Sequence, residues 1–224
     1  FFMYVIPRIE YNVKIVTHNS ALGVGEEYRK FLDHPRVISW YAQNANIEHP
    51  KLRSIPLGLA NKRWEHGDVD EFESVLQASI GREHLVYMNF NIQTSPDERS
   101  EVFDMFSKKD FVHSAPERPF RDYLHDLRGS KFSLSPQGRG VDCHRVWESI
   151  LMGTIPIVKN CRNISFYKDM PILIVDKWDD VSKDFLNEEY AKISKSCTNS
   201  KLFLDYWIDE LGLLGVKEQT GDKR

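Results

Sequence analysis

The sequence lacks any apolar run long enough to span a bilayer, and it shows no signal peptide. The opening segment FFMYVIP is too short, and has the wrong flanks, for either role. With 33 acidic and 30 basic residues the net charge is only -3, which indicates no general affinity for nucleic acid or anionic membranes. We therefore expect no membrane span in this chain and no nucleic-acid partner.

Cysteine is scarce. The three cysteines, Cys143, Cys161 and Cys197, are too few and too widely spaced for a disulfide framework or a zinc site. This usage is typical of a reducing compartment, so we expect a cytoplasmic or otherwise soluble protein. A single bridge between Cys161 and Cys197 stays open as an alternative.

What is present is the composition of a globular protein, with 41% hydrophobic and 28% charged residues among 224. Segments of strand length alternate with segments of helical periodicity, which predicts a doubly wound α/β fold. A helix at 68–82 is expected to link two domains, residues 1–80 and residues 81–224. We expect strands at 13–17, 37–42, 52–57, 85–90, 111–112, 132–134, 155–158 and 171–175.

The stretch KFSLSPQGRGVDCHRVWESILMGTIPIVKN, residues 131–160, carries the densest chemical pattern. It is expected to contain, in order, a strand at 132–134, a loop with Gly138, Arg139 and Gly140, an N-cap at Asp142, a helix at 143–152 and a strand at 155–158. In α/β proteins such a unit binds phosphate, because the N–H groups at the N-terminus of the helix point at the ligand.

Three polar residues share one face of the expected helix. Arg145 and Glu148 are three positions apart, and Ser149 follows Arg145 by four. Arg145 can offer a diphosphate a bidentate fork, and a carboxylate one turn deeper, at Glu148, can accept from both hydroxyls of a ribose. The alternative is an ordinary amphipathic helix with a solvated ion pair.

The segment SPQGRGVDCHRVWESILMGTIPIV resembles the signature of the exostosin-like glycosyltransferases, Ser-Pro-x-Gly-x-Gly-x-Asp-x-x-Arg-x-x-Glu followed by Ile-Pro-Ile or Ile-Pro-Val. The resemblance is strongest to compact members from large viruses, algae and bacteria and to the ribitol xylosyltransferase branch. It implies a GT-B fold, with two Rossmann-like domains of which the N-terminal one is short here. The viral resemblance adds the cytosol of an infected host cell as a location.

The same resemblance implies a reaction. A sugar passes with inversion from a nucleotide donor to a glycan acceptor, without a cofactor and without an obligatory metal. UDP-xylose is the donor that the resemblance suggests first. It also implies that the loop before the helix at 97–106 faces the donor phosphates, with Thr94 and Arg99 as ligands; capping chemistry and a surface arginine are the alternative. The expected donor-binding residues are Thr94, Arg99, Ser135, Gly138, Arg139, Gly140, Asp142, Arg145 and Glu148.

In the N-terminal part, three expected strands each end in a loop with polar or aromatic side chains of the kind that bind sugars. The fragments THNS, WYAQN and IPLGLANKRW also resemble the exostosin-like branch, which favours an acceptor site over turn chemistry alone. The expected acceptor-side residues are His18, Asn19, Gln43, Asn44, Asn61 and Trp64.

One position departs from the family pattern. The His-Asn-Ser tripeptide is followed by Ala21, where an aspartate is expected from the resemblance. An inverting transfer needs a base for the acceptor proton, and the N-terminal candidates are His18, Glu26, His49 and His66. We favour His18, at the end of a strand, as the base, with Arg145 as the residue that stabilises the leaving group.

The sequence thus favours an inverting glycosyltransferase that uses a UDP-sugar. A sugar- or nucleotide-binding module without activity is the alternative that Ala21 supports. An NAD-binding protein is disfavoured, because the loop reads GxGxDxxR instead of GxGxxG. Closing helices are expected at 185–193 and 201–214, and a polar tail from Val216.

Overall fold

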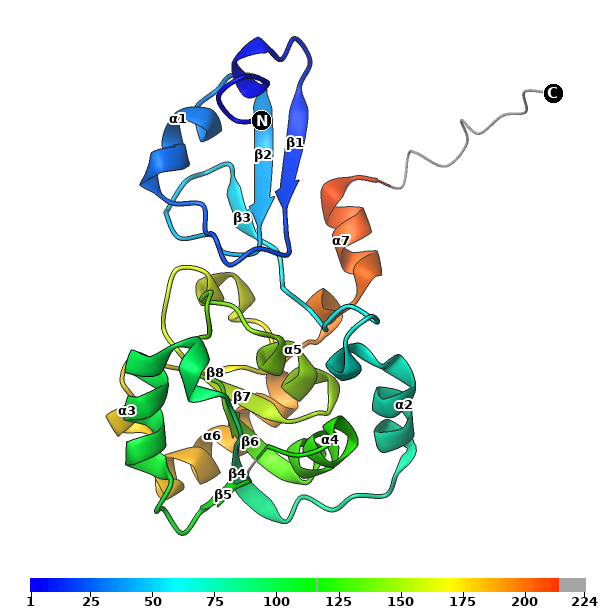
Figure 1. The fold of residues 1–224 in the computed structure, drawn as a ribbon, viewed down its shortest axis with the longest axis vertical. Coiled ribbons are helices and arrows are strands. Elements are labelled where there is room, and N and C mark those ends of the chain that lie inside the picture. The colour runs from blue at the N-terminus through cyan, green and yellow to red at the C-terminus, as the bar shows by residue number, and fades with distance from the viewer. Residues whose placement is uncertain (116, 214–224) are drawn as a thin grey trace, which may run out of the picture.

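The computed structural model describes residues 1–115 and 117–213, in which two separate parallel β-sheets form two units (Figure 1). The first sheet has the strand order β1-β2-β3, and the second has the order β5-β4-β6-β7-β8. Helical segments connect most of the consecutive parallel strands, whereas a loop without a helix joins β2 to β3. The predicted α/β class is therefore confirmed, with two Rossmann-like units of which the N-terminal one is the smaller.

The N-terminal unit contains β1 (Val13–Thr17), β2 (Val37–Ala42), β3 (Leu52–Ser54) and α1 (Arg29–Leu32). Its core includes the buried side chains of Trp40 and Leu32. The third strand ends three residues before the expected 52–57. Ile55 N–H still bonds to Ala42 O at 3.0 Å, but Pro56 has no N–H with which to continue the ladder.

The C-terminal unit carries five strands and five helices. Its strands are β4 (His84–Met88), β5 (Val112–Ser114), β6 (Ser130–Leu134), β7 (Ile155–Lys159) and β8 (Leu173–Val175). Its helices are α2 (Val69–Gln77), α3 (Pro96–Phe106), α4 (Phe120–Arg128), α5 (His144–Leu151) and α6 (Lys183–Ser196). The chain leaves β4 toward β5 on one side and returns to β6 on the other. Such a switch in strand order opens a crevice at the carboxyl ends of the strands, where ligands collect.

Helices cover both faces of the five-stranded sheet. On one face Val102 and Phe106 of α3 and Leu186 of α6 form a core with the strands. On the other face the buried side chains of α2 and α4 pack together with Tyr87 of β4. Helix α5 lies on a third cluster, which includes Trp147. The expected linker helix at 68–82 is shorter than predicted, because α2 ends at Gln77 and the backbone of its C-cap, Ala78, is extended (ψ 141°).

The C-terminal segment crosses back to the N-terminal unit, where α7 (Leu204–Leu211) lies beside β1 in Figure 1. Lys14 Nζ donates to Leu211 O at 2.7 Å. The single helix expected at 201–214 is interrupted at Phe203, whose backbone is extended, and Gly212 ends α7 in the left-handed conformation (φ 67°). Leu214 and the predicted tail from Val216 lie outside the described residues.

Buried hydrogen bonds join the two units along the seam between them. Asn163 Oδ1 accepts from Ala45 N at 2.9 Å and from Ser54 Oγ at 2.7 Å. Cys161 is a free thiol, so the bridge to Cys197 that the sequence left open does not form. None of the helices in the described part of the chain has the length and apolar character that crossing a bilayer requires.

Candidate functional site

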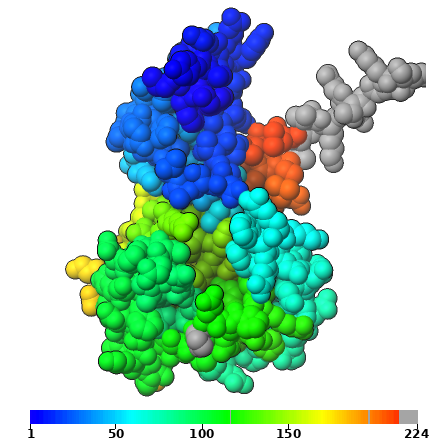
Figure 2. Space-filling model, in the orientation of Figure 1, coloured from blue at the N-terminus to red at the C-terminus, as the bar shows by residue number. Residues whose placement is uncertain are grey.

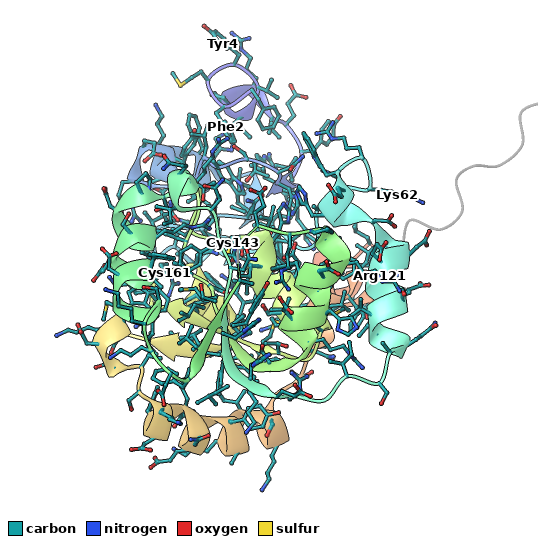
Figure 3. All side chains as sticks on the ribbon, turned by 60° about the horizontal axis from the view of Figure 1, so that its bottom comes forward. Phe2, Tyr4, Lys62, Arg121, Cys143 and Cys161 are labelled. Atoms are coloured by element: carbon teal, nitrogen blue, oxygen red, sulfur yellow. The ribbon has the colours of Figure 1, made fainter. Side chains whose placement is uncertain are left out.

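A cleft of about 860 Å³ lies between the two units, at the carboxyl ends of β4 and β6 and the N-terminus of α5. Figure 2 shows this face of the molecule hollowed where the blue N-terminal unit meets the green and cyan parts of the larger unit. Figure 3 places Cys143, the residue before α5, near this junction. Two Rossmann-like units that face each other across a cleft form the GT-B-type arrangement that was expected.

The glycine loop lines the cleft and needs its glycines for close packing. A Cβ on Gly138 would lie 3.2 Å from Arg99 Nη2, and one on Gly140 would lie 3.0 Å from Asn44 Nδ2 of the opposite unit. Gly138 N–H donates to Gly140 O at 3.1 Å, so this amide closes the loop on itself. The loop is therefore a tight turn that brings α5 up to the N-terminal unit.

Arg99 holds this loop in place. Its guanidinium donates from Nε to Gln137 O at 2.8 Å, from Nη1 to Asn91 O at 2.8 Å and from Nη2 to Pro136 O at 3.4 Å. Burial lowers the pKa of Arg99 to about 10, and the charge of Arg145 adds to the effect. Both Thr94 and Arg99 line the cleft, as expected, but Thr94 Oγ1 donates to Asn91 O at 2.9 Å. Arg99 is buried, at 4% exposure, so it is not the surface arginine of the alternative, and donor binding by Thr94 and Arg99 stays a prediction.

Arg145 differs from Arg99 in having guanidinium atoms without a partner. It lies in the first turn of α5, and its Nε and Nη1 are buried with no hydrogen-bond partner among the described residues. Its guanidinium carbon is 5.7 Å from the centre of the Phe90 ring. A buried guanidinium that lacks acceptors is costly, and an anion in the cleft would satisfy it.

Glu148 lies one turn further along α5, buried at 5% exposure, and it lines the same cleft. Its Oε2 accepts from Tyr123 Oη at 2.7 Å. Burial raises the pKa of Glu148, while the Tyr123 hydrogen bond and the charge of Arg145 oppose that shift. The solvated ion pair that the sequence offered as an alternative does not hold, because Glu148 is buried and bonded to a tyrosine.

Asp142 is not the N-cap that we expected. Cys143 occupies the N-cap position, without a side-chain cap hydrogen bond. The Asp142 carboxylate instead accepts from Trp147 Nε1 at 2.8 Å and from Leu57 N at 2.7 Å. Burial raises the pKa of Asp142 to about 7. The residue borders the cleft, but its two oxygens tie the glycine loop to the link between the units.

Ser135 also departs from its expected place. It is buried, its hydroxyl lies 3.4 Å from Ser133 Oγ, and it borders a smaller cavity of about 150 Å³ behind the loop instead of the main cleft. Ser149 is likewise buried and donates to Arg145 O at 2.6 Å. Among the residues expected to bind the donor, the main cleft brings together Thr94, Arg99, Gly138, Arg139, Gly140, Asp142, Arg145 and Glu148.

On the N-terminal wall, the amide side chains bind the chain itself. Asn19, in the left-handed region (φ 61°), donates its N–H to Gln43 Oε1 at 2.7 Å. Asn44 Nδ2 donates to Ser20 O at 3.0 Å, and its Oδ1 accepts from Asp142 N at 3.3 Å. Asn19 and Gln43 line the cleft, whereas Asn44 lies buried behind it.

Besides Asn44, three expected acceptor-side residues lie outside the lining of the cleft. His18 Nε2 donates to Pro56 O at 2.9 Å, and Asn61 is exposed. Trp64 is half exposed and stacks on His66, with ring centres 6.2 Å apart. Their roles in acceptor binding stay predictions.

Sequence reasoning missed several cleft residues. Tyr123 and His144 line the cleft, but neither is among the residues that the sequence predicts for the site. Asn89 and Asn91 follow the carboxyl end of β4. Polar residues after a predicted strand also mark the N-terminal loops, so the same pattern could have predicted these two residues. The cleft also contains residues that no pattern marked: Glu65, Glu117, Arg118 and Cys143. Within the described ranges, no three His, Cys, Asp or Glu side chains come together as metal ligands would.

Comparison with known proteins shows which family the chain belongs to. Residues 92–211, more than half of the sequence, match the family model described as RXYLT1 C-terminal domain. The chain belongs to this family. The RXYLT1 C-terminal domain match confirms the expected relationship to the ribitol xylosyltransferase branch of the exostosin-like proteins, and it includes the whole motif from the glycine loop to Glu148. The narrower resemblance to viral, algal and bacterial members stays a prediction.

No curated protein matches the chain in sequence. Among solved structures, the one titled "Crystal structure of GtfA/B complex" matches with a TM-score of 0.40 and 11% identity, over 90% of this chain and 52% of that chain. The chain thus spans about half the length of that solved chain.

Proposed function

We propose that this protein is a glycosyltransferase that binds a nucleoside diphosphate sugar in the cleft between its two units. The observation that carries the proposal is the buried guanidinium of Arg145, whose Nε and Nη1 have no partner in the described part of the chain, beside a cleft that Arg145 and Glu148 both line. A cation and a carboxylate one helical turn apart match the two polar parts of a nucleoside diphosphate, its phosphates and its ribose hydroxyls.

Arg145 would contact the diphosphate, with the positive end of the α5 dipole behind it. Glu148 presents a carboxylate that Tyr123 holds through one oxygen, which leaves the other oxygen for a ribose hydroxyl. The glycine loop would lie beside the donor, and Arg99 holds that loop in place through its hydrogen bonds to the backbone. Membership in the RXYLT1 C-terminal domain family supports the donor as a sugar nucleotide, with UDP-xylose as the first to test.

Transfer would proceed by in-line displacement at the anomeric carbon, with inversion. The acceptor oxygen forms the new bond to that carbon while the bond to the diphosphate oxygen breaks and its electron pair stays on the phosphate. Arg145 and the N-terminus of α5 stabilise the charge that develops there, which is where preorganised donors lower a barrier most. Acceptor specificity would belong to the N-terminal wall of the cleft, and no metal is required for this scheme.

The experiment that tests this proposal is calorimetric titration of the protein with UDP, GDP, CMP and NAD, followed by a panel of UDP-sugars. We expect UDP and one UDP-sugar to bind, and release of free sugar from that donor over hours. Selective binding of NAD, or binding of no nucleotide, would refute the proposal.

A binding module without activity is the second candidate, and Ala21 is the observation that favours it. This residue lines the cleft at a position where the family resemblance leads us to expect an aspartate. Tight binding of a UDP-sugar with neither hydrolysis nor transfer to any glycan would support the module. Release of the sugar from its donor would exclude it.

A further inference from the structure

An acceptor hydroxyl must lose a proton as it attacks the anomeric carbon, so the proposed glycosyl transfer needs a general base facing the cleft. Two of the four N-terminal candidates, His49 and Glu26, form hydrogen bonds away from the cleft. His49 Nε2 contacts Asp33 Oδ1 at 3.0 Å while its Nδ1 accepts from Lys51 N at 3.1 Å, and Glu26 pairs with Arg29. Neither His49 nor Glu26 lines the cleft.

His18 and His66 are weaker candidates than their residue type suggests. His18 donates its Nε2 proton to Pro56 O and lies outside the lining of the cleft. His66 lines the cleft, but it is exposed, and its ring contacts with Trp64, Phe120 and His144 do not fix a tautomer. A base must be held in one tautomer with its lone pair toward the proton that it takes.

His144 meets this requirement. It is the first residue of α5, it lines the cleft, and its Nδ1 lies 2.7 Å from Gly58 O. A carbonyl oxygen only accepts, so the proton of the neutral ring is on Nδ1 and Nε2 keeps its lone pair. The hydrogen bond to Gly58, in the link between the two units, also fixes the orientation of the ring at the junction where donor and acceptor sides meet.

The surroundings of His144 favour the neutral ring. Burial lowers the pKa of His144 below its usual 6.5, and the nearby charge of His18 lowers it further, against the opposing effect of the Gly58 hydrogen bond. His66 faces it at a ring distance of 6.3 Å, and Arg145 follows it in the helix. The positive end of the helix dipole also disfavours an added proton.

We propose that His144 Nε2 is the general base of the transfer. In this step Nε2 takes the proton of the acceptor hydroxyl, or of water, as that oxygen bonds to the anomeric carbon and the diphosphate leaves with the electron pair. The imidazolium then returns its proton to solvent. The inference rests on the proposed function, because it assigns a role within that reaction.

The test compares His144→Asn with His144→Ala. Asparagine keeps an N–H near the position of Nδ1 and can still donate to Gly58 O, but it has no basic nitrogen; alanine removes both. We measure hydrolysis of UDP-xylose, or of the UDP-sugar that binds, across pH, with UDP affinity by calorimetry. We expect His144→Asn to bind UDP normally and to lose about 10²-fold or more in hydrolysis. In the unmutated protein, hydrolysis falls as the pH drops through the lowered pKa of His144.

The matched control is His125→Asn, an exposed histidine of α4 outside the cleft, which should hydrolyse the donor at the unmutated rate. Full activity in His144→Asn, with loss only in His144→Ala, would show a purely structural role and overturn the inference. Loss in His18→Asn or His66→Asn, with activity kept in His144→Asn, would overturn it as well. In each of these outcomes UDP binding persists, whereas failure of the proposed function removes UDP binding itself.

A second measurement does not depend on activity. Long-range ¹H–¹⁵N NMR spectra of the protein, assigned with His144→Asn, report which ring nitrogen carries the proton at pH 7.5. We expect Nδ1–H and a bare Nε2. A proton on Nε2 would rule out His144 as the base.

Discussion

The two walls of the cleft use their polar side chains in different ways. On the C-terminal wall, Arg145 lines the cleft and its buried Nε and Nη1 have no hydrogen-bond partner among the described residues, while one oxygen of Glu148 accepts from Tyr123. On the N-terminal wall, Gln43 and Asn44 bind backbone groups of the loop after β1. The first wall leaves polar side-chain atoms that a ligand could contact, whereas the amide side chains of the second wall bind the protein itself.

We infer from this difference that the two walls contribute to ligand binding in different ways. Arg145 and Glu148, the two residues of the C-terminal wall that we propose bind the donor, lie within one motif, so helical geometry alone places them together. The N-terminal wall gathers residues from three loops, and each loop needs internal hydrogen bonds because its backbone has no regular partner. We infer that donor binding depends on a few side chains of α5, whereas the N-terminal wall acts through the shape of the loops.

The largest effect is expected at Arg145. Arg145→Ala removes the proposed contact to the charge on the leaving diphosphate, and the loss should be about 2–4 kcal/mol of barrier by analogy with lost oxyanion donors. The measurement is the initial rate of donor hydrolysis. Arg121→Ala is the matched control, because Arg121 is an exposed arginine of α4, labelled in Figure 3, that donates to Ser74 Oγ at 2.9 Å. Equal rates in both variants would contradict the division of roles between the walls.

Glu148→Gln should act on donor affinity. The amide oxygen can still accept from Tyr123, but the charge that would strengthen hydrogen bonds from the ribose is lost. Hydrogen bonds to a charged group contribute about 1.5–3 kcal/mol, so we expect UDP to bind roughly 10- to 100-fold more weakly by calorimetry at pH 7.5. Glu101→Gln, at an exposed position of α3, supplies the control. Unchanged affinity in Glu148→Gln would remove Glu148 from the donor site.

The third prediction concerns how much the hydrogen bonds between the two units contribute to stability. Asn163→Ala leaves Ala45 N–H and Ser54 Oγ without their shared acceptor in a buried place. We expect the free energy of unfolding in urea to fall by about 1–3 kcal/mol. Asn160→Ala removes an exposed amide that donates to Asp176 Oδ1 at 2.8 Å, and it should cost much less. Similar losses in the two variants would mean that the seam contributes no more than a surface contact.

The same contrast explains what the sequence could predict. Both sheets, and the strand, glycine loop, helix and strand around Arg145, follow from local periodicity and turn residues. The positions of Arg145 and Glu148 on one face of α5 follow from their spacing. Because these features depend on neighbours in the chain, one sequence is enough to predict them.

Features that depend on distant contacts could not be predicted in this way. Asp142 is of a residue type that often caps helices, yet its carboxylate accepts hydrogen bonds from the Leu57 amide and the Trp147 indole, which lie in two different segments. His144 gains its fixed tautomer from Gly58, 86 positions away in the sequence. Tyr123 reads as an inward core residue until its hydroxyl is seen to donate to Glu148.

The last expected effect concerns the pH dependence of stability and Asp142, which belongs to the C-terminal unit but accepts from Leu57 N in the link to the N-terminal unit. Burial raises its pKa from the ordinary 3.8 to about 7, so the folded protein keeps this proton where the unfolded chain has lost it. Stability should therefore fall as the pH rises from about 4 to 7 and change little above, with a slope of at most about 1.4 kcal/mol per pH unit from this group.

Asp142→Asn tests this by removing the titration. Its amide nitrogen faces a donor, either Leu57 N or Trp147 Nε1, so a uniform loss of stability is expected, and the informative quantity is the slope. We expect the free energy of unfolding of Asp142→Asn, measured in urea at steps of pH between 4 and 7, to fall less steeply than that of the unmutated protein. Asp104→Asn, at an exposed position of α3, should keep the original slope. Identical slopes in all three proteins would mean that the two N–H donors hold Asp142 ionised throughout, and that the seam does not respond to pH.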